Sequence, residues 1–323
     1  MHLPHFIQLH QPAAQALATE AQDGLLQASA AIAPKFFYNA LGSRLFDAIT
    51  ELQAYYPTRT EAAIFAAYRR EMAQAIHAVA GPRPVMVDLG AGNCAKAARL
   101  FDVIDPQAYV AVDISVDYLR EALAALQREH PSIVMSGVGL DFSEQLALPH
   151  DLPGVDDAPR LMFYPGSSIG NFSPCRAQAL LGDMRHAARG GALLIGVDLV
   201  KSSQVLQAAY DDELGVTAAF NLNALLNLNA LLGADFRIAQ WQHVALFNDA
   251  ESRIEMHLQA RQDLVVTWPG AQRRFAAGER IHTENSYKWT PSGFTQLLQD
   301  AGFTQVRCWR DPQDAFGVFL AWD

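Results

Sequence analysis

The sequence has few cysteines. Cys94, Cys175 and Cys308 are the three among 323 residues, and they lie far apart without a C-x-x-C pair. A disulfide framework or a structural zinc site needs paired or clustered cysteines, so neither is expected. The cysteine content instead favours a reducing compartment such as the cytoplasm.

Long hydrophobic runs are also missing. No stretch of about 18 uncharged apolar residues occurs, which is the length that a membrane-spanning helix needs. The first 30 residues contain His2, His5 and His10 but lack the basic and apolar regions of a signal peptide. We therefore expect a soluble cytoplasmic protein without a membrane partner.

Basic residues are fewer than acidic residues. The 24 Lys and Arg residues are outnumbered by 34 Asp and Glu residues, which gives a formal net charge of −10. Binding to a nucleic-acid backbone needs a basic surface, so nucleic acid is not expected as a partner. The hydrophobic content of 50% allows a sizeable core. The length predicts about two domains.

The middle of the chain has the pattern of a doubly wound α/β domain. Five short apolar runs lack polar alternation, as expected for parallel strands whose two faces are both covered by helices. Connecting helices are predicted at residues 117–130 and 176–189. The five predicted strands are residues 85–89, 109–114, 133–140, 161–164 and 192–199.

Two segments lie outside this pattern. Residues 1–60 begin irregularly and become helical near Pro34, and Thr58 is the expected N-cap of the helix that follows. Residues 200–285 are predicted to form an inserted lobe. Its expected elements are helices at 201–210 and 217–232 and a meander of strands at 240–247, 253–260 and 262–267.

The end of the chain returns to the α/β pattern. A helix is predicted at 291–301, followed by strands at 304–310 and 316–322 that form an antiparallel hairpin closing the sheet. We therefore expect a core domain from residues 61–199 and 286–323. Residues 1–60 and 200–285 are expected to form a second lobe of mixed α and β structure.

The strongest local motif is the glycine turn after the first predicted core strand. Gly90 and Gly92 let the backbone approach a ligand closely, and the following helix offers unpaired N–H groups. Asp113, at the end of the next predicted strand, can accept hydrogen bonds from ribose hydroxyls. The motif indicates a ribose-bearing cofactor, although the glycines alone also fit a plain strand-to-helix turn.

The residues around the glycine turn distinguish between two possible cofactors, NAD and S-adenosylmethionine. The turn fits the loose dinucleotide pattern G-x-G-x-x-G/A, which keeps an NAD-linked enzyme as an alternative. However, Asp88 directly before the turn would repel a pyrophosphate, and it is typical of S-adenosylmethionine loops. Asp141 and Phe142 suit the exocyclic amine and the face of an adenine ring. We therefore expect the Rossmann-like sheet of a class I methyltransferase, whose usual ending is the antiparallel hairpin.

Several motifs make the expectation more specific. From about residue 30 to the C-terminus, the sequence resembles the histidine-specific Nα-methyltransferase family of ergothioneine biosynthesis. The resemblance implies three methyl transfers from S-adenosylmethionine to the α-amino group of L-histidine, giving hercynine, and an amino-acid-binding lobe against the methyltransferase core. The motifs are Pro34-Lys35-Phe36-Phe37-Tyr38, Tyr55-Tyr56-Pro57-Thr58-Arg59, Gly166-Ser167-Ser168-Ile169-Gly170-Asn171-Phe172, Gly215-Val216-Thr217-Ala218-Ala219-Phe220-Asn221 and Thr283-Glu284-Asn285-Ser286.

The resemblance also implies which residues form the site. Contacts with S-adenosylmethionine are implied for Tyr38, Gly90, Lys96, Asp113, Asp141 and Phe142, and the loop analysis adds Asp88 and Gly92. Contacts with the amino acid are implied for Tyr56, Asn171, Tyr210, Met256, Glu284 and Ser286, with Thr217 close by.

The chemistry of these side chains suits histidine. Glu284 can accept an imidazole N–H, and Ser286 can meet the other ring nitrogen. Asn171 can bridge the amine and carboxylate, while Tyr210 can donate to the carboxylate. Tyr56 is expected to orient the ring or to relay the amine proton. Because methyl transfer needs a neutral amine aimed at a sulfonium carbon, orientation should supply most of the catalysis, without a metal.

Other interpretations stay open. A carboxylate plus a hydroxyl could also hold an indole N–H, so another aromatic amino acid or a tryptophan-derived amine is an alternative substrate. A non-catalytic regulator that binds S-adenosylmethionine is a further alternative. His243, His257 and His282 match no metal-site spacing and receive no role, and Cys94 is expected to pack near the cofactor. The oligomeric state stays open, with a monomer favoured.

Overall fold

The computed structural model describes residues 3–9, 14–149, 151–155 and 158–323. The chain divides into two compact units. Unit 1 contains Met1–His10, Pro57–Val200 and Lys288–Asp323, and unit 2 contains Gln11–Tyr56 and Lys201–Tyr287. Each unit is thus assembled from segments that are distant in the sequence. Every helix of the described ranges is too short or too polar to cross a membrane.

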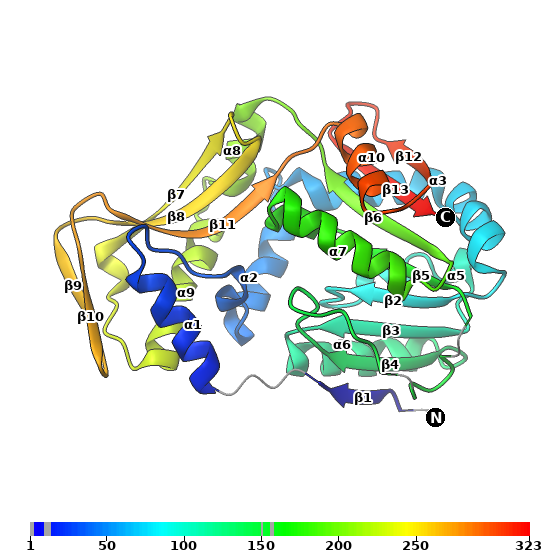
Figure 1. The fold of residues 1–323 in the computed structure, drawn as a ribbon, viewed down its shortest axis with the longest axis horizontal. Coiled ribbons are helices and arrows are strands. Elements are labelled where there is room, and N and C mark those ends of the chain that lie inside the picture. Colours follow the sequence, from blue (N-terminus) through cyan, green and yellow to red (C-terminus); the bar gives the residue numbers. More distant parts are fainter. Residues whose placement is uncertain (1–2, 10–13, 150, 156–157) are drawn as a thin grey trace. The chain divides into compact units, whose positions relative to one another are not determined.

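Unit 1 is built on one eight-stranded sheet in the order β1-β4-β3-β2-β5-β6-β13-β12 (Figure 1). The strands from β1 to β6 pair in parallel, while β13 pairs antiparallel with β6 and with β12. The expected α/β fold with a closing hairpin is confirmed. The strands are β1 (His5–Gln8), β2 (Val85–Leu89), β3 (Ala108–Asp113), β4 (Val134–Gly139), β5 (Arg160–Tyr164), β6 (Ala192–Asp198), β12 (Gln305–Arg310) and β13 (Phe316–Trp322).

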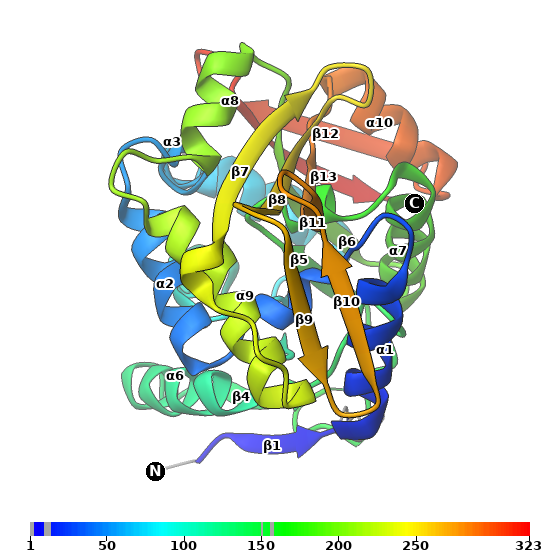
Figure 2. The same ribbon diagram turned by 90° about the vertical axis from the view of Figure 1, so that its left-hand side faces the viewer.

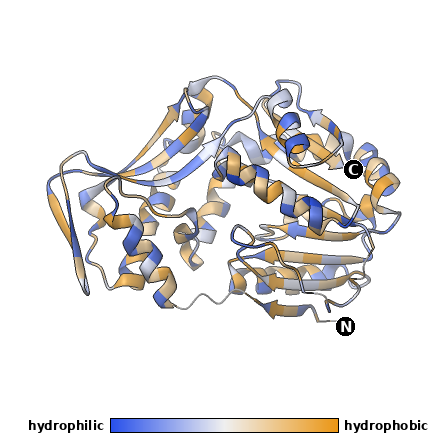
Figure 3. Ribbon diagram, in the orientation of Figure 1, coloured by the Kyte–Doolittle hydropathy of each residue, from blue (hydrophilic) through white to orange (hydrophobic). Residues whose placement is uncertain are grey.

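Helices cover both faces of this sheet, which explains why its central strands are buried along their whole length and mainly hydrophobic (Figure 3). One hydrophobic cluster joins α3 and α6 to the sheet, and a second joins α7 and α10 to it. The helices are α3 (Tyr56–Ala80), which begins at the unit boundary, α4 (Ala95–Ala98), α5 (Phe101–Ile104), α6 (Val116–Glu129), α7 (Pro174–Ala187), α10 (Pro291–Asp300) and the short 3₁₀ helix η2 (Ser168–Asn171).

The order of the strands reverses next to β2. The chain proceeds outward from β2 through β3 to β4 and then returns to β5 on the other side of β2. Ligands of such open sheets bind at the carboxyl ends of the strands beside this switch point. The glycine turn directly follows β2, so it occupies the position where a ligand is expected.

Two expectations for the N-terminal part were wrong. Residues 5–8 form β1 and extend the sheet of unit 1 by pairing with β4, whereas the whole segment 1–60 was expected to be helical or irregular. A short strand of mixed polarity gives little local signal, because its pairing with β4 is long-range. Thr58 is not an N-cap. Helix α3 already begins at Tyr56, and Pro57 in its first turn has a fixed φ suited to a helix start.

Unit 2 combines helices with two small antiparallel sheets (Figure 2). One sheet has the order β11-β8-β7, and the other is the ribbon β10-β9. A hydrophobic cluster joins α1, α8 and α9 to these strands. The elements are α1 (Ala14–Leu26), η1 (Pro34–Phe37), α2 (Ala40–Glu51), α8 (Ser203–Tyr210), α9 (Val216–Leu232), η3 (Ile238–Gln240), β7 (Trp241–Asn248), β8 (Arg253–Ala260), β9 (Leu264–Trp268), β10 (Ala271–Phe275) and β11 (Arg280–Tyr287).

The strand pairing of unit 2 corrects the predicted meander. Strands β7 and β8 pair as expected, but β9 pairs with β10, and the second neighbour of β8 is β11. Sequence analysis did not predict β11 as a strand. Its burial pattern breaks the period of two at residues 283 and 284, which are both buried, because its register with β8 shifts there. An interrupted alternation hides a strand from a periodicity search.

Candidate functional site

The glycine turn in unit 1 is held open by a carboxylate. Gly90 and Gly92 have positive φ values of 69° and 52°, a conformation that glycine adopts without strain. Asp113 accepts hydrogen bonds from the Gly92 amide at 2.9 Å and from the Ser115 amide at 2.8 Å. Apart from Gly92 and its two neighbours in the chain, no atom of the described residues lies within 4 Å of the position that a Gly92 Cβ would take. The turn therefore presents open backbone, which suits a closely bound ligand.

Asp88 lies within β2, below this turn. Its side chain is buried, and Oδ2 accepts a hydrogen bond from the Tyr109 hydroxyl at 2.6 Å. Oδ1 has no hydrogen-bond partner among the described residues. Burial raises the pKa of Asp88 to about 7, although the Tyr109 hydroxyl and the Lys96 ammonium act in the opposite direction. Asp88 is thus a carboxyl group whose charge changes near neutral pH.

Asp141 and Phe142 follow β4 at the same edge of the sheet. Asp141 Oδ1 accepts hydrogen bonds from the amide and the hydroxyl of Ser143. The Phe142 ring packs edge-on against Tyr164, and its Cζ lies 3.9 Å from the position of a Cβ built on Gly90. Unit 1 therefore brings the predicted cofactor residues from the ends of β2, β3 and β4 to one edge. Gly90, Gly92, Asp113, Asp141 and Phe142 provide backbone room, carboxylates and an aromatic face, a set that fits S-adenosylmethionine.

Lys96 is paired with Glu61, a further candidate site residue that was not predicted from the sequence. Its ammonium lies 2.8 Å from Glu61 Oε2, and Glu61 Oε1 accepts the Gly166 amide at 2.8 Å. Glu61 comes from α3 and is 1% exposed. The carboxylate therefore joins the helix after the glycine turn to the loop after β5. A lone acidic residue among the apolar positions of α3 was the available signal.

The loop after β5 carries the candidate residue Asn171. Gly166 and Ser167 have φ values of 81° and 59°, and the Ser167 hydroxyl accepts the Asp198 amide at 2.8 Å. Asn171 is the last residue of η2 and is half-buried. A non-glycine residue with positive φ is uncommon and is fixed here by its side chain. Asn171 belongs to unit 1, whereas the other candidate substrate contacts belong to unit 2.

Unit 2 joins two of these candidates directly. The Tyr210 hydroxyl and the Ser286 hydroxyl share a hydrogen bond of 2.7 Å. Ser286 and Glu284 are both buried on β11, and Glu284 lies opposite the buried Met256 on β8. The Tyr55 ring packs edge-on against Tyr210. A carboxylate, two hydroxyls and a thioether are thus gathered in one part of the small sheet.

The remaining candidates in unit 2 have their own partners. The Lys201 ammonium donates a hydrogen bond to the Tyr56 hydroxyl at 2.7 Å. The Thr217 amide, in the first turn of α9, donates to Asp212 at 2.8 Å. Tyr38, predicted to contact the cofactor, belongs to unit 2 and packs edge-on against Phe220 and other rings. The grouping described for unit 1 therefore does not include Tyr38.

His243 was assigned no role from the sequence, yet it contacts a candidate residue. Its Nε2 donates a hydrogen bond to the Tyr210 carbonyl at 2.8 Å, so Nδ1 accepts one from the Asn221 amide at 2.8 Å. Burial lowers the pKa of His243, which keeps the ring neutral and able to make both bonds. His243 therefore fixes the end of α8 that carries Tyr210.

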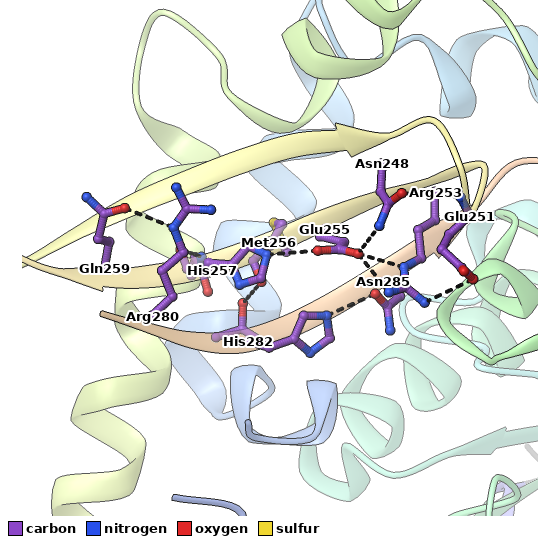
Figure 4. Close-up of polar contacts among 12 residues, drawn as sticks. Asn248, Glu251, Arg253, Glu255, Met256, His257, Gln259, Arg280, His282 and Asn285 are labelled. Carbon is purple, nitrogen blue, oxygen red and sulfur yellow. Dashed lines mark hydrogen bonds and ion pairs between the residues drawn. The ribbon is translucent and has the colours of Figure 1, made fainter. Parts of the chain in front are cut away.

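His257 and His282 lie on the more exposed face of the β11-β8-β7 sheet, opposite the face that carries Glu284 and Ser286 (Figure 4). Their rings pack edge-on with centroids 5.2 Å apart, and His257 donates a hydrogen bond to Glu255 at 3.1 Å. Within the part of the chain that the structure describes, no group of three or more His, Cys, Asp or Glu side chains is arranged to hold a metal ion. Cys94 is buried, which raises the pKa of its thiol to about 12 and disfavours a nucleophilic thiolate.

Comparisons with known proteins agree with these features. The sequence profile of the family described as "Histidine-specific methyltransferase, SAM-dependent" matches residues 17–322. The chain is 40% identical over 316 residues to a histidine N-alpha-methyltransferase of Mycolicibacterium smegmatis, covering 96% of this chain and 95% of that protein. A protein of the same name from Mycobacterium tuberculosis is also 40% identical, with 95% and 94% covered.

A more distant relative is a 4-dimethylallyltryptophan N-methyltransferase of Claviceps purpurea. It is 25% identical over 318 residues, covering 88% of this chain and 89% of that protein. The family profile nevertheless spans almost the whole chain, including both structural units. This chain belongs to the family of histidine-specific, S-adenosylmethionine-dependent methyltransferases.

Proposed function

We propose that this protein transfers methyl groups from S-adenosylmethionine to the α-amino group of L-histidine, three times in succession, to give hercynine. The observation that carries the proposal is the pair Glu284 and Ser286, buried together on β11 with Ser286 bonded to Tyr210. A carboxylate accepts a hydrogen bond, and a hydroxyl donates or accepts one. The pair therefore matches the donor nitrogen and the acceptor nitrogen of a neutral imidazole.

This pair also provides selectivity. An amino acid without ring nitrogens would not make the hydrogen bonds that imidazole can make with Glu284 and Ser286. A hydrogen bond to a neutral group contributes about 0.5–1.5 kcal/mol, and one to a charged group about 1.5–3 kcal/mol. We therefore expect strong discrimination against aliphatic amino acids, because rejection is strongest where a site is built to hydrogen-bond its substrate.

The residues of unit 1 fit the methyl donor. When bound, S-adenosylmethionine supplies a methyl group on a positively charged sulfur. Asp113 is proposed to accept from the ribose hydroxyls and Asp141 from the adenine amine, while Phe142 offers a face for the adenine ring. Lys96 is proposed to contact the donor through an ammonium that Glu61 orients. Asp88, Gly90 and Gly92 complete the proposed set in unit 1, and Tyr38, which belongs to unit 2, remains a proposed contact of the donor.

The amine must lose a proton before each transfer, because only a nitrogen with a free lone pair can attack. Asn171 is proposed to hold the amine and the carboxylate of the amino acid. Tyr56 is proposed to orient the substrate or to relay the proton. Because Lys201 already donates to the Tyr56 oxygen, the proton of the Tyr56 hydroxyl is directed toward another acceptor. Thr217 and Met256 are proposed to line the substrate site.

The proposal is tested by incubating the purified protein with S-adenosylmethionine and, separately, each proteinogenic amino acid, and by following product masses. Stepwise gain of up to three methyl groups on histidine supports it, and absence of transfer to histidine contradicts it. Glu284→Gln is the matched variant, since it keeps the shape and removes the charge. It should weaken the preference for histidine while leaving affinity for S-adenosylmethionine unchanged.

The relative from Claviceps purpurea motivates one alternative, an N-methyltransferase acting on a tryptophan-derived amine. Tryptophan and dimethylallyltryptophan are therefore included among the substrates tested. Transfer to either in preference to histidine would support the alternative. Binding of S-adenosylmethionine without transfer to any amine would indicate a regulator, and a nicotinamide absorbance change would indicate an NAD-linked enzyme.

A further inference from the structure

Strand β11 contains one residue more than the stretch of β8 that it pairs with. His282 lies opposite His257, and Glu284 lies opposite Met256, so Thr283 is the additional residue. Such a β-bulge bends the strand and changes the direction in which the following side chains point. The bulge directly precedes the two residues that we propose to bind the imidazole.

The bulge determines which side chains of β11 are buried. On β8, Ile254 and Met256 are buried on the same face, two residues apart. With the bulge, Ser286 lies opposite Ile254 and Glu284 lies opposite Met256. Without it, the pairing beyond residue 283 would slip by one residue, and every following side chain would change faces.

Without the bulge, Glu284 and Ser286 would no longer lie on the buried face of the sheet, where we propose that they bind the imidazole. Thr283, which is already buried, would lie opposite Met256, and Asn285 would take the buried position opposite Ile254. Glu284 would lie opposite Glu255 on the outer face. Glu255 already accepts hydrogen bonds from Asn248, Arg253 and His257 there (Figure 4). A second carboxylate directly across the strand pair would be repelled by Glu255.

The bulge has a hydrogen bond on each face of the sheet. On the buried face, the Thr283 hydroxyl donates to the Met256 carbonyl at 3.0 Å, and Thr283 is fully buried. On the outer face, His282 Nε2 donates to Asn285 Oδ1 at 2.9 Å, across the bulge (Figure 4). A bulge interrupts the backbone ladder, and the threonine hydroxyl supplies a hydrogen bond to a carbonyl at this interruption.

The main chain beside the bulge is also held. The His282 amide donates to the Ala30 carbonyl at 2.8 Å, and the Ile32 amide donates to the His282 carbonyl at 2.9 Å. These bonds fix the residue before the bulge from the side away from β8. His282, directly before the bulge, is therefore held on one side by β8 and on the other by residues 30–32.

We propose that Thr283 is a positioning residue for substrate specificity: its hydroxyl, bonded to the Met256 carbonyl, holds the bulge that turns Glu284 and Ser286 to the buried face. The identity of the substrate rests on the function proposed above. The role of Thr283 in setting the register does not depend on that identity. Thr283 is not proposed to touch the substrate or the methyl donor.

The test compares Thr283→Val, which keeps the shape and removes the hydroxyl, with Thr283→Ser, which keeps the hydroxyl. Thr283→Val should raise the KM for histidine by about tenfold or more, as expected for loss of a buried hydrogen bond. Thr283→Ser should stay within about threefold of the parent protein. The Kd for S-adenosylmethionine should be the same in all three. Equal KM values for the parent and Thr283→Val, or equal increases in both variants, would overturn the proposal.

Two further measurements test the role of Thr283 without assuming which amine is the substrate or that Thr283→Val folds. Crystal structures of the parent and Thr283→Val should show residue 284 opposite Met256 in the former and displaced in the latter, whichever amine is the substrate. An unchanged register in Thr283→Val contradicts the inference even if histidine is methylated. If Thr283→Val does not fold, Thr283→Ala replaces it, because this variant also lacks the hydroxyl. It must raise the KM for histidine at least threefold without changing donor affinity, and an unchanged KM overturns the proposal.

Discussion

The Glu61 carboxylate lies directly against the backbone of Gly196. A Cβ placed on Gly196 would stand 1.9 Å from Glu61 Oε1. That oxygen also accepts the Gly166 amide, and the other carboxylate oxygen binds Lys96. Glu61 cannot move away without losing these contacts, so the absence of a side chain at position 196 and the place of Glu61 depend on each other.

Replacing Gly196 with alanine should therefore destabilise the protein. Overpacking a filled interior typically costs about 1–3 kcal/mol, and we expect a loss in this range by urea denaturation. The control is the same substitution in a Glu61→Ala background, where the conflicting carboxylate is gone and Phe316 Cε1 lies 3.1 Å from the added Cβ. There, Gly196→Ala should cost much less, which makes the two substitutions non-additive. Additive effects would show that the crowding involves other atoms.

Asp113→Asn should weaken binding of S-adenosylmethionine. The carboxylate holds the Gly92 amide with one oxygen and the Ser115 amide with the other, whereas an asparagine side chain has one oxygen. Loss of a hydrogen bond to a charged group predicts about a 10- to 100-fold increase in Kd, measured by calorimetry. Asp117→Asn, which removes an exposed charge from the same region, should leave the Kd unchanged. Equal effects of both substitutions would assign the loss to charge alone.

The hydroxyls of Tyr210 and Ser286 should act as one unit. Tyr210→Phe and Ser286→Ala each remove the bond of 2.7 Å between them, and each should raise the KM for histidine by about tenfold. The double variant should be little worse than either single one, because the shared interaction is lost only once. A double variant whose effect equals the product of the single effects would mean that the two hydroxyls contribute independently. Donor affinity serves as the control.

Asp88 should make stability fall as the pH rises toward neutrality. Its pKa is raised by burial from 3.8 to about 7, so between these values the folded protein holds a proton that the unfolded chain has lost. The contribution of this proton to the free energy of unfolding is fully present below pH 3.8 and is lost as the pH rises through 7. Asp88→Asn stays neutral, so its stability relative to the parent should increase from pH 4 to 7. Urea denaturation at intervals across this range measures the difference, and a constant difference would contradict the assignment.

His257 should make the stability fall as the pH decreases, which is the opposite of the effect of Asp88. Burial and the neighbouring His282 lower its pKa from 6.5 to about 4, although Glu255 acts against this shift. Between these values the unfolded chain binds a proton that the folded protein does not, so the contribution is present above pH 6.5 and is lost as the pH falls toward 4. His257→Gln should reduce the slope of unfolding free energy against pH in this window. An unchanged slope would show that His257 titrates normally.

The sequence predicted most of unit 1 because its signals are local. A strand buried on both faces is a continuous apolar run, and the predicted bounds of residues 85–89 are those of β2. The glycine turn could be found because it follows β2 directly, and the carboxylates Asp88, Asp113 and Asp141 because each lies in, at the end of or just after its strand. Their convergence at one edge followed from the parallel order of the sheet.

Long-range pairing escaped prediction. Strand β1 has weak local character and is defined by its neighbour β4, and β11 is obscured by its own bulge. Glu61 lies 35 residues before Lys96 and 105 before Gly166, so no spacing in the sequence connects them. His243 has no partner near it in the sequence either, since it bonds to Tyr210 and Asn221.

The amino-acid sequence by itself determined the α/β class of the core, the glycine turn and the family, because apolar runs, turn residues and ordered motifs are read along the chain. Tertiary structure alone decided which face of β11 carries Glu284 and Ser286. That choice depends on the register with β8, and one additional residue in a strand reverses the direction of every side chain after it. Contacts that set a register join distant segments, so no local pattern contains them.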